Sequence, residues 1–282
     1  MVTTYCPETL SEALEIREKE STMIFAGGTD LMVKYKSTSG ALPQFPKDIL
    51  YIGNLQELKE ISITGEWIKI GSMVKLSTLL EERRLPDYIK IPVKGIGSPS
   101  IRNLGTMGGN ICNASPAGDT LPMLYALDVA IELSSAKGTR KVGIQDFIKG
   151  PGKTDIKPNE IMTGIFIKRT EFNRWGYRKV GARKANAISK LSVFCTAQID
   201  QSSVRDIRIS FGSVGPTVIR NREIEKEIVQ IGVARLKQEL GGILEAYADM
   251  LSPISDVRST KDYRKDVSLN ILKEIIEGDL IL

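Results

Sequence analysis

The most informative absence in this 282-residue sequence is histidine, which does not occur at all. Without an imidazole the chain can form no Ser-His-Asp or Cys-His catalytic group, no HExxH metal site and no flavin linkage through histidine. We therefore expect neither catalytic residues nor metal ligands in this chain. Any chemistry is expected to come from a bound cofactor.

Cysteine is nearly as scarce. The three cysteines, Cys6, Cys112 and Cys195, lie far apart and form no CxxC pair. This spacing argues against a disulfide framework, a zinc site and an iron–sulfur cluster held by this chain alone. We interpret Cys112 as a small buried side chain and expect the cytoplasm as the compartment.

Long apolar runs and clustered basic residues are also missing. No run has the length of a membrane span, and Met1-Val2-Thr3-Thr4 does not resemble a signal peptide. The net charge is +5, from 39 basic and 34 acidic residues, and aromatic residues make up only 6%. The basic residues are scattered among acidic ones, so we expect no nucleic-acid binding, and the excess charge favours an anionic cofactor or an acidic partner.

What the chain does contain is enough apolar sequence for a large core. An apolar fraction of 41% and a charged fraction of 26% are typical of a globular protein. The length exceeds that of one average domain, which predicts two or three lobes.

Glycine and small polar residues are concentrated in one segment, SIRNLGTMGGNICNASPAGD, from Ser100 to Asp119. Glycine allows a backbone to approach a ligand closely and to direct successive N–H groups into one concavity. Such a segment suits an anionic ligand, phosphate above all. A glycine-rich turn between two strands is the alternative for one such segment taken alone.

A second glycine segment lies near the N-terminus, where the apolar strand Ile24-Phe25-Ala26 runs into Gly27-Gly28-Thr29-Asp30-Leu31. A strand, a glycine turn and a helix start form a recurrent phosphate-binding geometry, although the spacing fits neither GxGxxG nor GxxxxGK[ST]. Two glycine segments favour a ligand with two phosphates, such as a dinucleotide. A carboxylate repels phosphate, so we expect Asp30 either to cap the helix or to bind a sugar hydroxyl.

The elements around these segments follow from periodicity and turn residues. Helices are expected over 7–20, 75–84, 222–239, 242–251 and 267–277, and a further one begins after Asp119. Strands are expected over 22–26, 49–52, 61–64, 67–70, 129–133, 140–144, 161–167, 175–180, 187–199 and 204–211. Residues 149–158 are too rich in glycine and proline for regular structure.

The motifs AGGTDLMVKYK and IRNLGTMGGNICNASPAGDTLPMLYALDVAIEL resemble the FAD-binding medium subunit of the molybdenum hydroxylases, the xanthine dehydrogenase and carbon monoxide dehydrogenase type enzymes. The resemblance extends to QDFIKGPGKT, NEIMTGIFI and YRKVGARKANAISKLS, and so covers nearly the whole chain. It implies an α+β protein with the two-lobed FAD-binding fold of the PCMH or vanillyl-alcohol-oxidase type. The lobes implied are an N-terminal α/β lobe over 1–54, a second α+β lobe over 55–170 and a C-terminal α+β domain over 171–282, with a three-stranded sheet and helices.

The resemblance also implies roles for individual residues around non-covalently bound FAD. The pyrophosphate and nearby sugar would lie against Phe25, Ala26, Gly27, Gly28, Thr29, Asp30 and Leu31. A second grip would come from Thr106, Met107, Gly108, Gly109 and Asn110. The isoalloxazine ring would lie beside Ile96 and Ile161.

Two further assignments leave alternatives open. Asp119 would bind hydroxyls of the ribityl chain, although its position suits a helix N-cap equally well. Lys179 would place its ammonium near the carbonyl edge of the ring. Arg178 could take that place instead, but a strand directs the two side chains to opposite faces, so only one can.

Function follows in the same way. The resemblance implies an oxidoreductase subunit that works with two partners. A large molybdopterin-binding subunit would hydroxylate the substrate at its molybdenum cofactor, and the electrons would pass through [2Fe-2S] clusters on a small subunit. This chain would receive them from those clusters and pass them to NAD+ or another acceptor. Many relatives carry two arginines where this chain has Gly181-Ala182-Arg183-Lys184, which leaves the acceptor open. A self-contained flavin oxidoreductase is the alternative, and a nucleotide-binding regulatory module is a third.

Overall fold

The computed structural model describes residues 2–281, whose contacts group into two units. The first unit comprises the described parts of Met1–Glu82, with Ser98–Ala114 and Val129–Lys168. The second comprises Arg83–Gly97, Ser115–Asp128 and the described part of Arg169–Leu282. Each unit has its own sheets and its own core.

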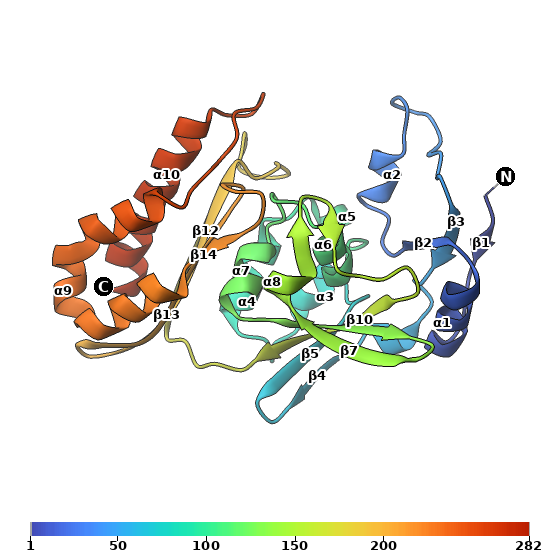
Figure 1. The fold of residues 1–282 in the computed structure, drawn as a ribbon, viewed down its shortest axis with the longest axis horizontal. Coiled ribbons are helices and arrows are strands. Elements are labelled where there is room, and N and C mark those ends of the chain that lie inside the picture. The colour runs from blue at the N-terminus through green and yellow to red at the C-terminus, as the bar shows by residue number, and fades with distance from the viewer. Residues whose placement is uncertain (1, 282) are drawn as a thin grey trace. The chain divides into compact units, whose positions relative to one another are not determined.

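A small parallel sheet begins the first unit. Its strands are β1 (Thr4–Tyr5), β2 (Thr22–Phe25) and β3 (Asp48–Tyr51), paired in the order β1-β3-β2 (Figure 1, blue). Helix α1 (Leu10–Lys19) begins at Thr9, whose hydroxyl accepts a hydrogen bond from the Glu12 N–H at 3.2 Å. The predicted N-terminal α/β arrangement is therefore present.

A five-stranded antiparallel sheet forms the larger part of the first unit, in the order β4-β5-β10-β6-β7. Its strands are β4 (Ile61–Thr64), β5 (Trp67–Gly71), β6 (Ala130–Ser135), β7 (Gly138–Gly143) and β10 (Ile161–Lys168). The hairpin of β4 and β5 turns at Gly65-Glu66, as the sequence predicted.

Short helices connect these strands. They are α2 (Leu31–Lys34), η1 (Gln56–Leu58), α3 (Leu76–Glu81), α5 (Pro99–Arg102), α6 (Met107–Asn113) and α8 (Ile144–Phe147). Residues 149–158 do contain regular structure, contrary to the prediction, because β8 (Ile148–Gly150) and β9 (Lys153–Thr154) form a small hairpin.

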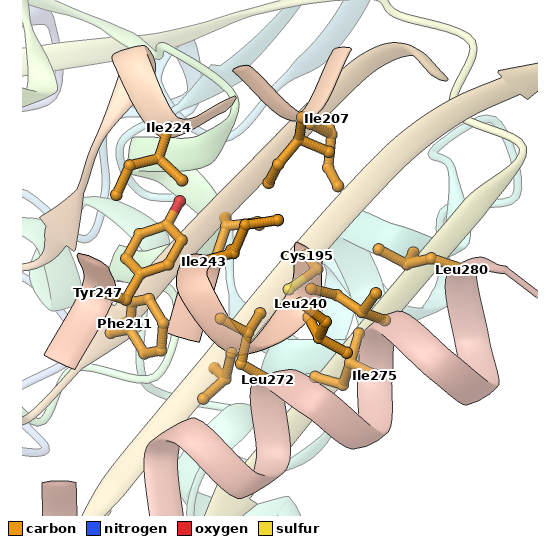
Figure 2. Packing of buried hydrophobic residues seen from close by; sticks show 14 of the residues in the cluster. Cys195, Ile207, Phe211, Ile224, Leu240, Ile243, Tyr247, Leu272, Ile275 and Leu280 are labelled. Atoms are coloured by element: carbon orange, nitrogen blue, oxygen red, sulfur yellow. The ribbon is translucent and has the colours of Figure 1, made fainter. Parts of the chain in front are cut away.

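The second unit is built on one antiparallel sheet, β11-β12-β13-β14. Its strands are β11 (Arg174–Val180), β12 (Leu191–Asp200), β13 (Ser203–Gly212) and β14 (Ile219–Arg220), one more than predicted. One face packs on α9 (Arg222–Ala248), α10 (Lys261–Glu274) and the π-helical η2 (Ile275–Leu280). Figure 2 shows this core, in which Cys195 and Phe211 meet Leu240, Tyr247 and Leu272.

The opposite face of that sheet contacts α4 (Asp87–Lys94) and α7 (Leu121–Ala126). Here the Ser210 hydroxyl donates to the Pro122 carbonyl at 2.8 Å. The sequence did not predict α4, which contains Pro92. That proline is tolerated near the end of a helix of only eight residues whose Tyr88, Ile89 and Val93 are buried.

The long C-terminal helix differs from the prediction in the position of its break. We expected two helices, over 222–239 and 242–251, separated at Leu240-Gly241, but both of these residues lie within α9. The break is at Gly232, which has φ 71° and ψ 176°. The left-handed φ at this position favours glycine.

The α+β fold class is confirmed. The lobe boundaries 1–54, 55–170 and 171–282 stay a prediction, since residues 83–97 and 115–128 group with the C-terminal unit. No helix in the described part of the chain is long and apolar enough to cross a bilayer. Within residues 2–281, no three potential metal-ligating side chains gather at one place.

Candidate functional site

The turn after β2 exposes three consecutive backbone donors. Gly28 has φ 69°, a left-handed conformation that lets neighbouring N–H groups converge. Among the described residues, the N–H groups of Gly27, Gly28 and Thr29 find no hydrogen-bond acceptor. Three consecutive N–H groups without partners in the described residues, with a left-handed glycine among them, form a nest suited to an anion.

The second glycine segment has a different structure from the loop that the sequence predicted. Residues 107–113 form helix α6, and its first four N–H groups are already used. Met107 donates to the Val74 carbonyl at 3.1 Å and Gly108 to the Ser72 carbonyl at 3.1 Å. Gly109 donates to the Thr106 hydroxyl and Asn110 to the Thr106 carbonyl, both at 3.0 Å. Contact of these residues with FAD stays a prediction, but their N–H groups are not spare donors.

The two glycine segments nevertheless pack directly on each other within the first unit. A Cβ atom built on Gly27 would lie 1.8 Å from the Leu104 carbonyl oxygen. One built on Gly105 would lie 3.5 Å from the Thr29 hydroxyl. The chain around Leu104 thus supports the back of the Gly27–Thr29 turn.

The flanks of the first turn are partly as predicted. The Phe25 ring packs under Gly28, and it also meets Phe45 edge-on with ring centroids 6.1 Å apart. Asp30 occupies the N-cap position of α2, but its side chain makes no capping hydrogen bond and is exposed. The capping alternative for Asp30 is therefore wrong, and its binding of a sugar hydroxyl stays a prediction.

The remaining predicted residues are divided between the units. Ile161 lies in the first unit, 1% exposed, in a cluster with Leu50, Ile52 and Met73 against which Ala26 packs. Ile96 lies in the second unit, one residue after Gly95. Contact of either isoleucine with a flavin ring stays a prediction.

Asp119 and Lys179, which the sequence placed in separate roles, form a buried ion pair in the second unit. The Lys179 ammonium donates to Asp119 Oδ2 at 2.6 Å and to the Gly95 carbonyl at 3.0 Å. The Lys179 side chain is only 14% exposed and the Asp119 side chain only 8%. Helix α7 has Thr120 at its N-cap, so the alternative that Asp119 caps this helix is wrong.

The other oxygen of Asp119 has no partner. Asp119 Oδ1 is buried and makes no hydrogen bond to any of the residues that the structure describes. Burial raises the pKa of this carboxyl group to about 6, against the opposing effect of Lys179. An unsatisfied carboxylate oxygen in a buried site requires a donor.

Arg178 points away from this pair, as the strand geometry predicted. Its guanidinium lies 3.1 Å from both Glu274 and Asp279, which belong to α10 and η2 on the other face of the sheet. The alternative in which Arg178 replaces Lys179 beside the cofactor is therefore not supported by the orientation of its side chain.

Ser72 is a residue that the sequence reasoning missed. It follows β5 and is 4% exposed, and its hydroxyl is buried without a hydrogen-bond partner among the described residues. Its backbone lies against Gly108, where a Cβ atom would come within 2.6 Å of the Ser72 carbonyl oxygen. Ser72 and Gly108 lie 36 residues apart in the sequence. The position of Ser72 beside α6 follows only from the hydrogen bond between these two residues in the structure.

The Thr106 cap provides a first prediction. Replacing Thr106 with valine keeps the side-chain shape but leaves the Gly109 N–H without its acceptor, which should lower the free energy of unfolding by about 1 to 2 kcal/mol. Urea unfolding measures this loss. The control Thr64→Val, at the exposed end of β4, should change stability by less than about 0.5 kcal/mol. Equal losses in both variants would contradict the capping role.

Two known domain families match this chain. Residues 1–168 match the FAD binding domain in molybdopterin dehydrogenase, and residues 176–278 match the CO dehydrogenase flavoprotein C-terminal domain. The glyceraldehyde dehydrogenase medium chain of Sulfolobus acidocaldarius is 32% identical over 267 residues, covering 92% of each chain. The xanthine dehydrogenase FAD-binding subunit of Escherichia coli is 28% identical and covers 95% of this chain and 92% of its own.

A solved structure has the same fold. Reconstituted CO dehydrogenase from Oligotropha carboxidovorans contains a chain that superposes with a TM-score of 0.90 at 24% identity, covering 99% of this chain and 98% of its own. The class is therefore that of an FAD-binding oxidoreductase subunit. The chain belongs to the family of FAD-binding subunits of the molybdopterin dehydrogenases.

The residues present fit FAD. The Gly27–Thr29 turn offers free N–H groups of the kind that bind a pyrophosphate. Asp119 Oδ1 offers a buried acceptor for a hydroxyl donor such as a sugar alcohol.

Proposed function

We propose that this chain is the electron-transfer subunit of a molybdenum hydroxylase complex, taking electrons from [2Fe-2S] clusters of a small subunit and passing them to NAD+ or another acceptor. The observation that carries the proposal is the nest at Gly27–Thr29, closed from behind by Leu104. The medium-chain names of relatives that match over more than nine-tenths of this chain support it. A large molybdopterin-binding subunit would then supply the substrate site.

Each group of residues has a definable task in this function. Bound FAD supplies an isoalloxazine ring that accepts and gives electrons. The backbone at Gly27, Gly28 and Thr29 would hold the pyrophosphate, because converging N–H groups neutralise its charge without a cation. The Asp119–Lys179 pair would fix a hydroxyl of the cofactor while adding little net charge to the site.

A self-contained flavin oxidoreductase remains the second candidate. Such an enzyme activates its own carbon substrate, which usually requires a positioned acid or base. The sequence contains no histidine to serve in that role. This composition favours a subunit that depends on partners for the oxidation step.

The test combines composition with reactivity. Purified from its native host, the tagged chain should be yellow, release FAD rather than FMN on denaturation, and co-elute with a large molybdenum subunit and a small iron–sulfur subunit. Stopped-flow mixing of the FAD-loaded chain with NADH should bleach the flavin if NAD+ is the acceptor. A colourless chain that added FAD does not colour contradicts cofactor binding, and a stable yellow monomer without partners favours the second candidate. FAD-loaded chain that NADH does not bleach excludes only the nicotinamide as acceptor.

A further inference from the structure

We propose that Lys179 is a positioning residue, which holds the Asp119 carboxylate so that its second oxygen accepts a hydrogen bond from a hydroxyl of the bound cofactor. The sequence had suggested instead that the Lys179 ammonium acts directly on the flavin ring. The inference rests on the proposed function, because it takes FAD as the ligand.

The carboxylate is held at one oxygen and open at the other. Asp119 is 7% exposed, with Oδ2 only 2.6 Å from the Lys179 ammonium. Its Oδ1 is equally inaccessible and has no partner among residues 2–281. A second cation there would leave an excess positive charge, whereas a hydroxyl group satisfies Oδ1 without changing the charge.

The ammonium is directed at Asp119 by a second contact. Lys179 donates to the Gly95 carbonyl at 3.0 Å, at the C-terminal end of α4. Two of its three N–H donors are thus used, and its charge is balanced by Asp119 across 2.6 Å. A balanced lysine exerts little net field on a flavin ring, but it fixes the orientation of its carboxylate partner.

Tyr177 and Ser192, the other groups near Asp119, are neutral, so Lys179 is its charged partner. Tyr177 shares the face of β11 with Lys179, and burial raises the pKa of its phenol well above the usual value, so it stays neutral. Ser192, opposite Lys179 on β12, is neutral and lies close to the Tyr177 hydroxyl without a hydrogen bond of ordinary geometry. Loss of Lys179 therefore leaves Asp119 buried without a counter-ion.

A double-mutant cycle tests this assignment on the full chain. FAD affinity is measured by fluorescence quenching for Lys179→Met, Asp119→Asn and the double variant. Each single change should weaken FAD binding by about tenfold or more, because it leaves one member of a buried pair uncompensated. The FAD affinity of the double variant should be no lower than that of the single variant with the lower affinity, since residues in contact do not contribute additively. The matched control Arg178→Met, on the opposite face, should stay within about threefold.

The pH profile separates positioning from a merely structural role. In the unmutated chain FAD affinity should fall as the pH drops through about 6, where Asp119 takes up a proton. Lys179→Met should move this inflection to higher pH, because Lys179 is the group that lowers the pKa of Asp119. Asp119→Asn should abolish the inflection. Lys179→Arg, which keeps the charge, should recover most of the affinity and serves if the methionine variant does not fold.

Two results would overturn the inference. Additive losses in the double variant would show that the residues act separately. A Lys179→Met chain that binds FAD normally but has a shifted flavin reduction potential would place the ammonium at the ring itself. If the unmutated chain binds no FAD, the proposed function fails and the inference fails with it. That outcome can be told apart from the two results above, because both of them require an unmutated chain that binds FAD.

Discussion

Replacing Gly27 with alanine is expected to abolish FAD binding. The new methyl group would lie 1.8 Å from the Leu104 carbonyl oxygen and 2.6 Å from its carbon, closer than non-bonded atoms approach. Both obstacles are backbone atoms, so no side-chain rotation relieves the overlap. The Gly27–Thr29 turn must then move away from Leu104, which changes the positions of the three N–H groups that form the nest.

The expected loss of affinity is at least about a hundredfold, the order that losing two or more charge-assisted hydrogen bonds to a phosphate produces. Fluorescence titration of the apo chain with FAD measures it, and circular dichroism checks that the fold is retained. The control Gly143→Ala lies in the same unit, where a Cβ atom comes no closer than 3.7 Å to Asp146, and should bind FAD normally.

A milder substitution at Gly105 tests the same turn in case the Gly27 variant does not fold. A Cβ atom on Gly105 would lie 3.1 Å from the Ile101 carbonyl oxygen and 3.5 Å from the Thr29 hydroxyl, tight but not overlapping. Gly105→Ala should therefore show an intermediate loss of affinity with an intact circular dichroism spectrum. Normal affinity in both the Gly27 and the Gly105 variants would exclude the turn as the phosphate site.

Local features of this site could be predicted from the sequence because short-range rules determine them. The turn at Gly27-Gly28 follows an apolar strand, and the cap at Thr9 precedes an apolar stripe of helical period. The β4–β5 hairpin follows from alternation around Gly65-Glu66. In each case the residues that determine the structure are neighbours in the chain.

Features that depend on tertiary contacts could not be predicted in this way. Thr106–Asn110 has the glycine content of a loop, yet contacts with Ser72 and Val74 stabilise it as a helix end and use its N–H groups. Asp119 and Lys179 are 60 residues apart, and no sequence pattern indicates that they pair. Their pairing changes the chemistry expected of both residues.

Replacing Arg220 with methionine should produce the largest loss of stability in the second unit. The Arg220 guanidinium contacts both oxygens of Glu225, with a shortest distance of 2.9 Å, and each side chain is only 7% exposed. It also donates to the Tyr125 carbonyl at 2.6 Å and to Asp128 at 2.8 Å. Methionine fills similar volume but leaves Glu225 buried without its cation, a change that typically costs about 3 to 5 kcal/mol.

The pH dependence identifies the stranded carboxylate as the cause. Burial already raises the pKa of Glu225 above its usual value of 4.5, and removing Arg220 raises it further. A carboxyl group whose pKa is higher in the folded state contributes less stability as the pH rises from its unfolded value through its folded one. Urea unfolding of Arg220→Met should therefore show a smaller deficit at pH 5 than at pH 8. The double variant Arg220→Met/Glu225→Gln removes both charges and should regain much of the lost free energy of unfolding at pH 8. A loss of stability that depends neither on pH nor on Glu225 would instead assign the effect to the lost contacts with Tyr125 and Asp128.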